Sequence, residues 1–237
     1  MSQNNKKVFV SWSGGKEASL SCYRVMKNLN VESAYLLNMV SEDGTHSRSH
    51  GLGVEVLKAQ ADAIGVPIVQ KRATWGDYEG EFKKALADFK KKGVEIGVFG
   101  DIDVQEHRDW VERVCEESEI KPLLPLWQGE RSVLLEEFIN TGFKAILVVV
   151  NLQFLGEEWL GREINKEFMD DLKKLSNIDL CGEKGEYHTF VYDGPFFKKP
   201  VSFTIGKKIF TKTHGFLEIR IDSRLHGNDN NGYKLVT

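Results

Sequence analysis

The chain has 237 residues, of which 41% are hydrophobic and 28% are charged, and its formal net charge is -3. This composition is typical of a globular protein with a sizeable buried core, and it excludes the collagenous and disordered classes. Because the charge is nearly balanced, no overall basic field favours nucleic acid or a membrane surface, so we expect neither as a partner.

The sequence also lacks the signals of membrane insertion and secretion. The longest apolar run, 145–150, has six residues, well short of the roughly 20 that a spanning helix needs. Residues 1–7 contain no apolar stretch of the kind found in a secretory signal. Three widely spaced cysteines, Cys22, Cys115 and Cys181, suit neither a disulfide framework nor a zinc site. We therefore expect a cytoplasmic, reduced protein.

The first half alternates short β-branched runs with longer amphipathic stretches, the pattern of βα units around a parallel sheet. We expect an α/β fold, with an open, mainly parallel, Rossmann-like sheet flanked by helices and a smaller mixed module after it. The predicted strands are 7–11, 34–40, 68–71, 95–99 and 145–150, and the predicted helices begin at 17 and cover 54–64, 82–89 and 110–115.

After residue 151 this rhythm changes. The chain continues with a predicted helix at 162–175, a segment rich in Gly and Glu, and predicted strands at 202–210 and 215–222. We therefore predict two domains, 1–151 and 152–222. Residues 223–237 are rich in Asn and Gly and are expected to form a disordered tail.

The turn after the first predicted strand has the features of an anion site. It reads Ser11-Trp12-Ser13-Gly14-Gly15-Lys16 and opens directly into a helix. Adjacent glycines let the backbone approach a phosphate, and the free N–H groups and dipole of the helix favour its charge. Ser13 can donate a hydroxyl, and Lys16, on a loop expected to face solvent, can neutralise charge. The spacing does not fit a Walker loop, and a plain Gly-Gly turn capped by serine remains the structural alternative.

This turn carries a resemblance to a known superfamily. Ser13-Gly14-Gly15-Lys16-Glu17-Ala18 resembles the S-G-G-K-D-S loop of the PP-loop ATP pyrophosphatases, which cleave ATP to AMP and pyrophosphate. Glu17 stands where that pattern has Asp, and Ala18 where it has Ser. Further stretches resemble the diphthine-ammonia ligase family within that superfamily. They are 49–51, 100–102, 107–115, 125–127, 160–162 and 181–189.

The resemblance implies an activity and its substrates. Members of that family join ammonia to the carboxylate of diphthine on elongation factor 2, and ATP is converted to AMP and pyrophosphate. For this chain it implies an ATP-binding domain at 1–151, a substrate module at 152–222, and Mg²⁺ with the nucleotide. The sequence has no glutaminase domain, so we expect free ammonia as the nitrogen source. A homo-oligomer is compatible with the sequence.

The candidate nucleotide-binding residues follow from the expected sheet. In an open parallel sheet, ligands bind beyond the carboxyl ends of the strands. The candidates there are Ser11, Ser13, Gly14, Gly15, Lys16, Glu17, His50 and Gly100. Segment 41–51 is long and polar enough to close over ATP. Glu17 or Asp101 could hold Mg²⁺, with helix capping as the alternative for each.

The expected catalytic residues are Lys16, Asp101, Glu186 and His188. Glu186 and His188 belong to the polar segment 182–190. We expect Glu186 to orient ammonia or to take a proton from ammonium, and His188 to do the same near neutral pH. The structural alternative is a loop whose acids cap a helix and solvate a bend.

Two other functions stay open. The first is a PP-loop enzyme that modifies tRNA, although the chain lacks the paired cysteines and the basic run expected of one. The second is a non-catalytic nucleotide-binding module, which the departures at Glu17 and Ala18 favour.

Overall fold

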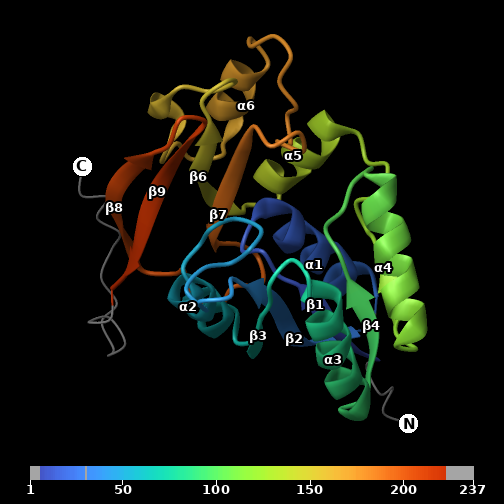
Figure 1. Ribbon diagram of the computed structural model, residues 1–237. Coiled ribbons are helices and arrows are strands. Elements are labelled where there is room, and N and C mark those ends of the chain that lie inside the picture. Colours follow the sequence, from blue (N-terminus) through green and yellow to red (C-terminus); the bar gives the residue numbers. More distant parts are fainter. Residues whose placement is uncertain (1–5, 30, 223–237) are drawn as a thin grey trace.

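The computed structural model describes residues 6–29 and 31–222, so the tail predicted at 223–237 lies outside the described residues. In chain order, the elements (Figure 1) are β1 (Lys6–Ser11), α1 (Lys16–Asn28), β2 (Val31–Val40), α2 (Val54–Ile64), β3 (Ile68–Arg72), α3 (Tyr78–Lys91), β4 (Val94–Val98), α4 (Gln105–Glu117), β5 (Lys121–Leu123), α5 (Arg131–Asn140), β6 (Lys144–Asn151), the 3₁₀ turn η1 (Glu157–Trp159), α6 (Lys166–Leu172), β7 (Tyr187–Asp193), β8 (Phe203–Phe210) and β9 (His214–Ile221).

The first sheet confirms the predicted fold class. Its five strands are parallel and lie in the order β3-β2-β1-β4-β5. In the central strand β1, Val8 and Val10 belong to one core cluster and Phe9 to another. Because successive side chains of a strand point to opposite faces, β1 is buried on both sides, as expected of a parallel sheet covered by helices.

The two core clusters separate the helices into two layers. Phe82 and Phe89 of α3 and Val114 of α4 pack with Phe9. Helices α1, α2 and α5 contribute to the other cluster, with Val8 and Val10 of β1. Apolar residues recur at helical spacing along α1 to α4, which is why these helices were predictable from the sequence.

The second sheet corrects one prediction. Residues 145–150 were expected to add a strand to the parallel sheet, but β6 lies in a four-stranded antiparallel sheet with the order β7-β6-β9-β8. An apolar run indicates that a strand is buried, but it does not indicate which strand pairs with it. The partners of β6 come later in the chain. The domain limits stay a prediction, and this pairing favours a boundary before β6.

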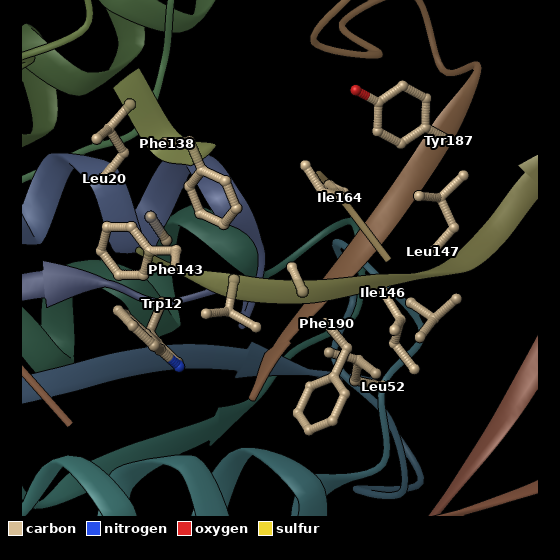
Figure 2. Close-up of a cluster of buried hydrophobic side chains, with 14 of the residues drawn as sticks. Trp12, Leu20, Leu52, Phe138, Phe143, Ile146, Leu147, Ile164, Tyr187 and Phe190 are labelled. Atoms are coloured by element: carbon tan, nitrogen blue, oxygen red, sulfur yellow. The ribbon is translucent and has the colours of Figure 1, made fainter. Parts of the chain in front are cut away.

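Both sheets contribute to one hydrophobic core. Figure 2 shows Trp12, which follows β1, in the same cluster as Phe138 of α5, Phe143, and Phe190 of β7. The rings of Phe138 and Phe143 are stacked with centroids 4.8 Å apart. This shared core holds the second sheet against α1 and brings β7 next to the turn between β1 and α1.

Other elements differ from expectation in detail. Helix α6 is shorter than the predicted 162–175, because Asn165 caps it by accepting the N–H of Phe168 at 2.9 Å. Neither β5, which has three residues including Pro122, nor α5 was predicted from the sequence. Within the part of the chain that the structure describes, no helix is long and apolar enough to cross a bilayer.

Candidate functional site

The turn between β1 and α1 lies where the strand order of the parallel sheet reverses. Strand β1 pairs with β2 on one side and with β4 on the other. Open α/β sheets bind ligands at such a reversal of strand order. Ser11 ends β1, and Lys16 begins α1. The predicted crevice is therefore located at the ends of β1 and β4.

The conformation of this turn requires its two glycines. Gly14 has φ +84°, and a Cβ there would lie 2.5 Å from Cδ2 of Leu57. A Cβ on Gly15 would lie 2.2 Å from Cε1 of His50. Left-handed backbone and such close approaches exclude larger residues. His50 thus packs directly on the turn, in keeping with its predicted place at the crevice.

Side-chain oxygens accept hydrogen bonds from backbone N–H groups of the turn. The N–H of Gly15 donates to Oγ of Ser13 at 3.3 Å, and the N–H of Lys16 donates to Oγ1 of Thr189 at 3.1 Å. N–H groups in the first turn of a helix have no intrahelical acceptor, and they are the groups that bind anions at such sites. A phosphate bound here would take over donors that Ser13 and Thr189 now engage.

Gln60 fixes the turn from the other side, and the sequence analysis missed it. The side chain is fully buried on α2. Its Nε2 donates to the carbonyls of Gly14 at 3.0 Å and Val191 at 2.6 Å, and its Oε1 accepts from Nε1 of Trp12 at 3.0 Å. The only sequence signal was a polar residue within the apolar stripe of a helix, since Leu57, Ala61 and Ile64 surround it.

Lys16 is the main correction at this site. We expected its side chain to face solvent, but the residue is 5% exposed. Its Nζ lies 2.6 Å from Oε1 of Glu17, donates to the carbonyl of Cys181, and lies 4.6 Å from the centre of the Tyr187 ring. Burial is the largest single effect and lowers its pKa, but Glu17, Tyr187 and Cys181 together outweigh burial and raise the pKa, so Lys16 stays charged. Strand β7 and the segment before it cover the turn.

Glu17 and Gly100 lie side by side. A Cβ on Gly100 would lie 3.0 Å from Cβ of Glu17 and 3.1 Å from the backbone nitrogen of Ala18. Gly100 therefore permits the end of β4 to approach α1. Asp101 lies next along the chain, with Oδ1 3.2 Å from Nδ1 of His107, and burial raises its pKa.

A magnesium site at Glu17 or Asp101 stays a prediction. Among residues 6–29 and 31–222, no cluster of three or more His, Cys, Asp or Glu side chains is placed to hold a metal ion. Mg²⁺ commonly uses one or two carboxylates together with substrate phosphates and water. The donors present fit that mode, in which the ion would arrive with the nucleotide.

Two histidines from distant segments are stacked beside the turn. The rings of His50 and His188 have centroids 4.6 Å apart, and Nδ1 of His50 lies 3.2 Å from the carbonyl oxygen of Thr189. Burial lowers the pKa of His50 to about 4 and that of His188 to about 3. Both rings are therefore neutral at pH 7, whereas we had expected His188 to titrate near neutrality.

Both carboxylate oxygens of Glu186, for which we predict a catalytic role, are bonded to backbone N–H groups of the segment before β7. The residue is fully buried. Its Oε1 accepts the N–H of Asp179 and its Oε2 accepts the N–H of Lys184, both at 2.9 Å. This geometry favours the structural alternative, in which Glu186 shapes the segment before β7.

Glu183 is the acid of this segment that interacts electrostatically with Lys16 and Glu17, and no role was predicted for it from the sequence. It is half-buried. Burial and then Glu17 raise its pKa to about 7, while Lys16 and Arg131 act in the opposite direction.

Arg131 forms hydrogen bonds with Asp179 at 2.9 Å and with Asp103 at 2.7 Å. The segment 179–186 is thereby tied to α5 and to the loop after β4.

A cavity of about 10 Å³, with room for about one water molecule, adjoins these groups. Lys16, Glu17 and Cys181 line one side of it, and apolar side chains line the rest: Leu20, Ile102, Leu126, Leu134, Leu135 and Phe138. This cavity is far smaller than the sites that hold small molecules, so a nucleotide could bind here only if the surrounding side chains moved.

Comparison with known proteins gives the family. Residues 6–122 match the model of the diphthamide synthase N-terminal domain, and residues 130–225 match that of the diphthamide synthase C-terminal domain. The chain belongs to the diphthamide synthase family. The first match contains the turn with Lys16, and the second contains the segment 179–186. This confirms the family resemblance of the sequence.

The relatives of this diphthamide synthase family member include proteins named diphthine–ammonia ligase. The Danio rerio protein is 27% identical over 217 residues, covering 80% of this chain and 83% of its own. The Homo sapiens protein is 28% identical, with 80% and 79% covered. The Schizosaccharomyces pombe protein is 29% identical, and the match covers 84% of this chain and 36% of that longer protein.

Among solved structures, a Methanocaldococcus jannaschii protein described as a predicted subunit of tRNA methyltransferase aligns with a TM-score of 0.42 at 16% identity. The alignment covers 83% of this chain and 100% of that one. This likeness is too distant to bear on fold or function.

Proposed function

We propose that the chain is an ATP-dependent ligase of the diphthine–ammonia ligase type, which transfers AMP to a carboxylate and then amidates it with ammonia. The observation that carries the proposal is the Gly14-Gly15-Lys16 turn at the start of α1, within a chain that matches both diphthamide synthase domains. The relatives named diphthine–ammonia ligase support diphthine on elongation factor 2 as the acceptor.

The chemistry explains why ATP is required. A carboxylate does not react with ammonia near neutral pH, because oxide would have to leave. Transfer of AMP to the carboxylate gives a mixed anhydride and releases pyrophosphate. Ammonia then attacks the acyl carbon, and AMP leaves with the oxygen that came from the carboxylate. The protein's share of this reaction is to align the groups and to stabilise charge.

The residues of the site divide this work. Gly14 and Gly15 let Leu57 and His50 pack against the turn, and the backbone N–H and Nζ of Lys16 would supply donors and charge to the phosphates. Bound Mg²⁺ would neutralise phosphate charge, with Glu17 or Asp101 as its protein ligand. His50 packs on the turn and, with His188, excludes water from the phosphate side.

The products of the reaction test the proposal. With Mg²⁺, ammonium and elongation factor 2 carrying diphthine, ATP should yield AMP and pyrophosphate in equal amounts. Oxygen-18 placed in the acceptor carboxylate should appear in AMP. Formation of ADP and orthophosphate, or of AMP without label, would contradict adenylation. Binding of ATP without any turnover, even with acceptor present, would instead favour the non-catalytic nucleotide-binding module.

A further inference from the structure

The ammonium group of Lys16 is enclosed by three groups of different chemistry. They are the carboxylate of Glu17, with Oε1 at 2.6 Å, the carbonyl oxygen of Cys181, and the face of the Tyr187 ring, whose centre is 4.6 Å from Nζ. We call these three groups the ammonium cage. Tyr187 begins β7 and Cys181 lies in the segment before it, so the second sheet and this segment supply two of the three groups.

The cage has the properties of a site for a small monovalent cation. A carboxylate and a carbonyl accept N–H donors, and an aromatic face attracts a desolvated cation. Tyr187 is 1% exposed and Lys16 is 5% exposed, so water does not screen these interactions. Glu183 adds a second carboxylate close enough to act electrostatically on both Lys16 and Glu17.

We propose that the ammonium cage is the binding site for the ammonium ion used in the reaction, and that the Lys16 ammonium group fills it while no phosphate engages that side chain. Calling ammonium a substrate rests on the proposed function. The cage itself is a feature of the structure. A lysine ammonium and a free ammonium ion present the same N–H donors, so the enclosed Nζ marks where the ion fits.

Nucleotide binding would open the cage. The phosphate-binding turn and the cage share Lys16, whose four-carbon stem lets Nζ move towards a triphosphate. With Asp101 as the ligand of Mg²⁺, the departure of Nζ would leave the Glu17 carboxylate and the Cys181 carbonyl without their cation, which is costly in a buried site. An ammonium ion relieves that cost. Ammonium should therefore bind after ATP, one side chain away from the phosphates.

The cage should also distinguish ammonium from potassium. K⁺ and NH₄⁺ are similar in size, but K⁺ is stabilised by many oxygens around it, whereas ammonium makes a few directed N–H bonds. The Lys16 group meets two oxygen ligands and a ring face. This arrangement suits directed donors, so ammonium should bind more tightly than K⁺.

Thermal unfolding in NH₄Cl, KCl and NaCl of equal concentration tests the proposal without turnover. In Lys16→Ala the cage lacks its cation, so ammonium at about ten times its Kd should raise the unfolding midpoint by roughly 3 °C relative to the other salts. Lys83→Ala is the matched control. Lys83 also pairs with carboxylates, Glu79 at 2.6 Å and Glu117 at 2.5 Å, but it is partly exposed and has no cage around it. It should show no preference for ammonium.

Wild-type protein provides a second arm that does not depend on folding of the variant. Without nucleotide it should not respond to ammonium. With the non-reacting analogue α,β-methylene ATP, it should show an ammonium-specific rise. Equal responses to all three salts, or no response in either arm, would overturn the proposal. A response in Lys16→Ala, together with no AMP formation by the wild-type protein, would leave the cage in place and reject the ligase function.

The KM for ammonium, measured at saturating ATP, then tests whether the ion binds in the cage. Tyr187→Leu removes the ring face and should raise the KM for ammonium at least tenfold, while the KM for ATP stays unchanged. Tyr187→Phe keeps the ring and loses only the hydrogen bond from the hydroxyl to the carbonyl of Leu180. It should retain the wild-type KM for ammonium. Equal increases in both variants would place ammonium elsewhere.

Discussion

The backbone N–H of Lys16 donates to the hydroxyl of Thr189 at 3.1 Å, across 173 positions of sequence. This bond joins the first turn of α1 to β7 and therefore joins the two sheets at the candidate nucleotide site. A residue of the second sheet thus holds a donor that a phosphate would use. Nucleotide binding and the position of β7 should consequently depend on each other.

Thr189→Val tests that dependence. Valine keeps the shape of threonine but leaves the buried N–H of Lys16 without an acceptor, so the free energy of unfolding should fall by about 1–3 kcal/mol. Saturating ATP should reduce the deficit, because phosphate oxygens can accept that N–H. Urea unfolding with and without ATP measures both effects. Thr189→Ser retains the hydroxyl and is the control; an equal loss in Ser and Val would assign the effect to packing.

Lys16→Ala should weaken ATP binding at least tenfold, or about 1.4 kcal/mol, because a cation at the phosphates is lost. Isothermal titration calorimetry measures the affinity. The variant should also be less stable, since Glu17 and the Cys181 carbonyl lose their partner. Circular dichroism must therefore confirm that the variant is folded. Unchanged ATP affinity in folded Lys16→Ala would show that the Gly14-Gly15 turn is only structural.

Glu186→Gln should destabilise the protein by about 1–3 kcal/mol. The amide places an NH₂ group against one of the two backbone N–H groups, of Asp179 and Lys184, that the carboxylate now accepts. Turnover should fall because segment 179–186 is no longer held in place, while ATP binding is largely retained. Chemical denaturation measures the loss of stability, and calorimetry measures ATP binding. A variant with full stability and no turnover would support Glu186 as a catalytic residue.

The stacked histidines should make the protein less stable in acid. In the unfolded chain an imidazole titrates near pH 6.5, whereas the folded pKa is about 4 for His50 and about 3 for His188. Between these values the unfolded state binds more protons. The free energy of unfolding should therefore fall as the pH drops from 6.5 towards 4, by up to about 1.4 kcal/mol per pH unit for each histidine.

Urea unfolding at pH 5 and pH 7 measures this dependence. His50→Asn and His188→Asn should each be less sensitive to pH than the wild type, because one imidazole of the stacked pair is gone. His46→Asn is the control, since His46 is exposed on the same loop as His50. If all three variants keep the wild-type pH dependence, the stacked pair is not its source.

The sequence by itself determined the parallel sheet and the turn after β1. Alternating runs of β-branched and amphipathic residues placed β1 to β4 and α1 to α4 within a few positions of where they lie. The Gly14-Gly15 pair marked the turn, because positive φ and close packing are local demands that glycine meets. Local conformational preferences and periodicity depend on residues that are close in the sequence, so they can be recognised without knowing the fold.

Only the tertiary structure decided what surrounds Lys16. Its partner Cys181 lies 165 positions away, Thr189 lies 173 positions away, and Gln60 joins Gly14 to Val191 from a third element. The same holds for β6, whose apolar run indicated burial but not its antiparallel partners. Periodicity reports which side of an element is buried. Which atoms meet there is set by how both sheets pack, since each buried polar group must find a partner within reach.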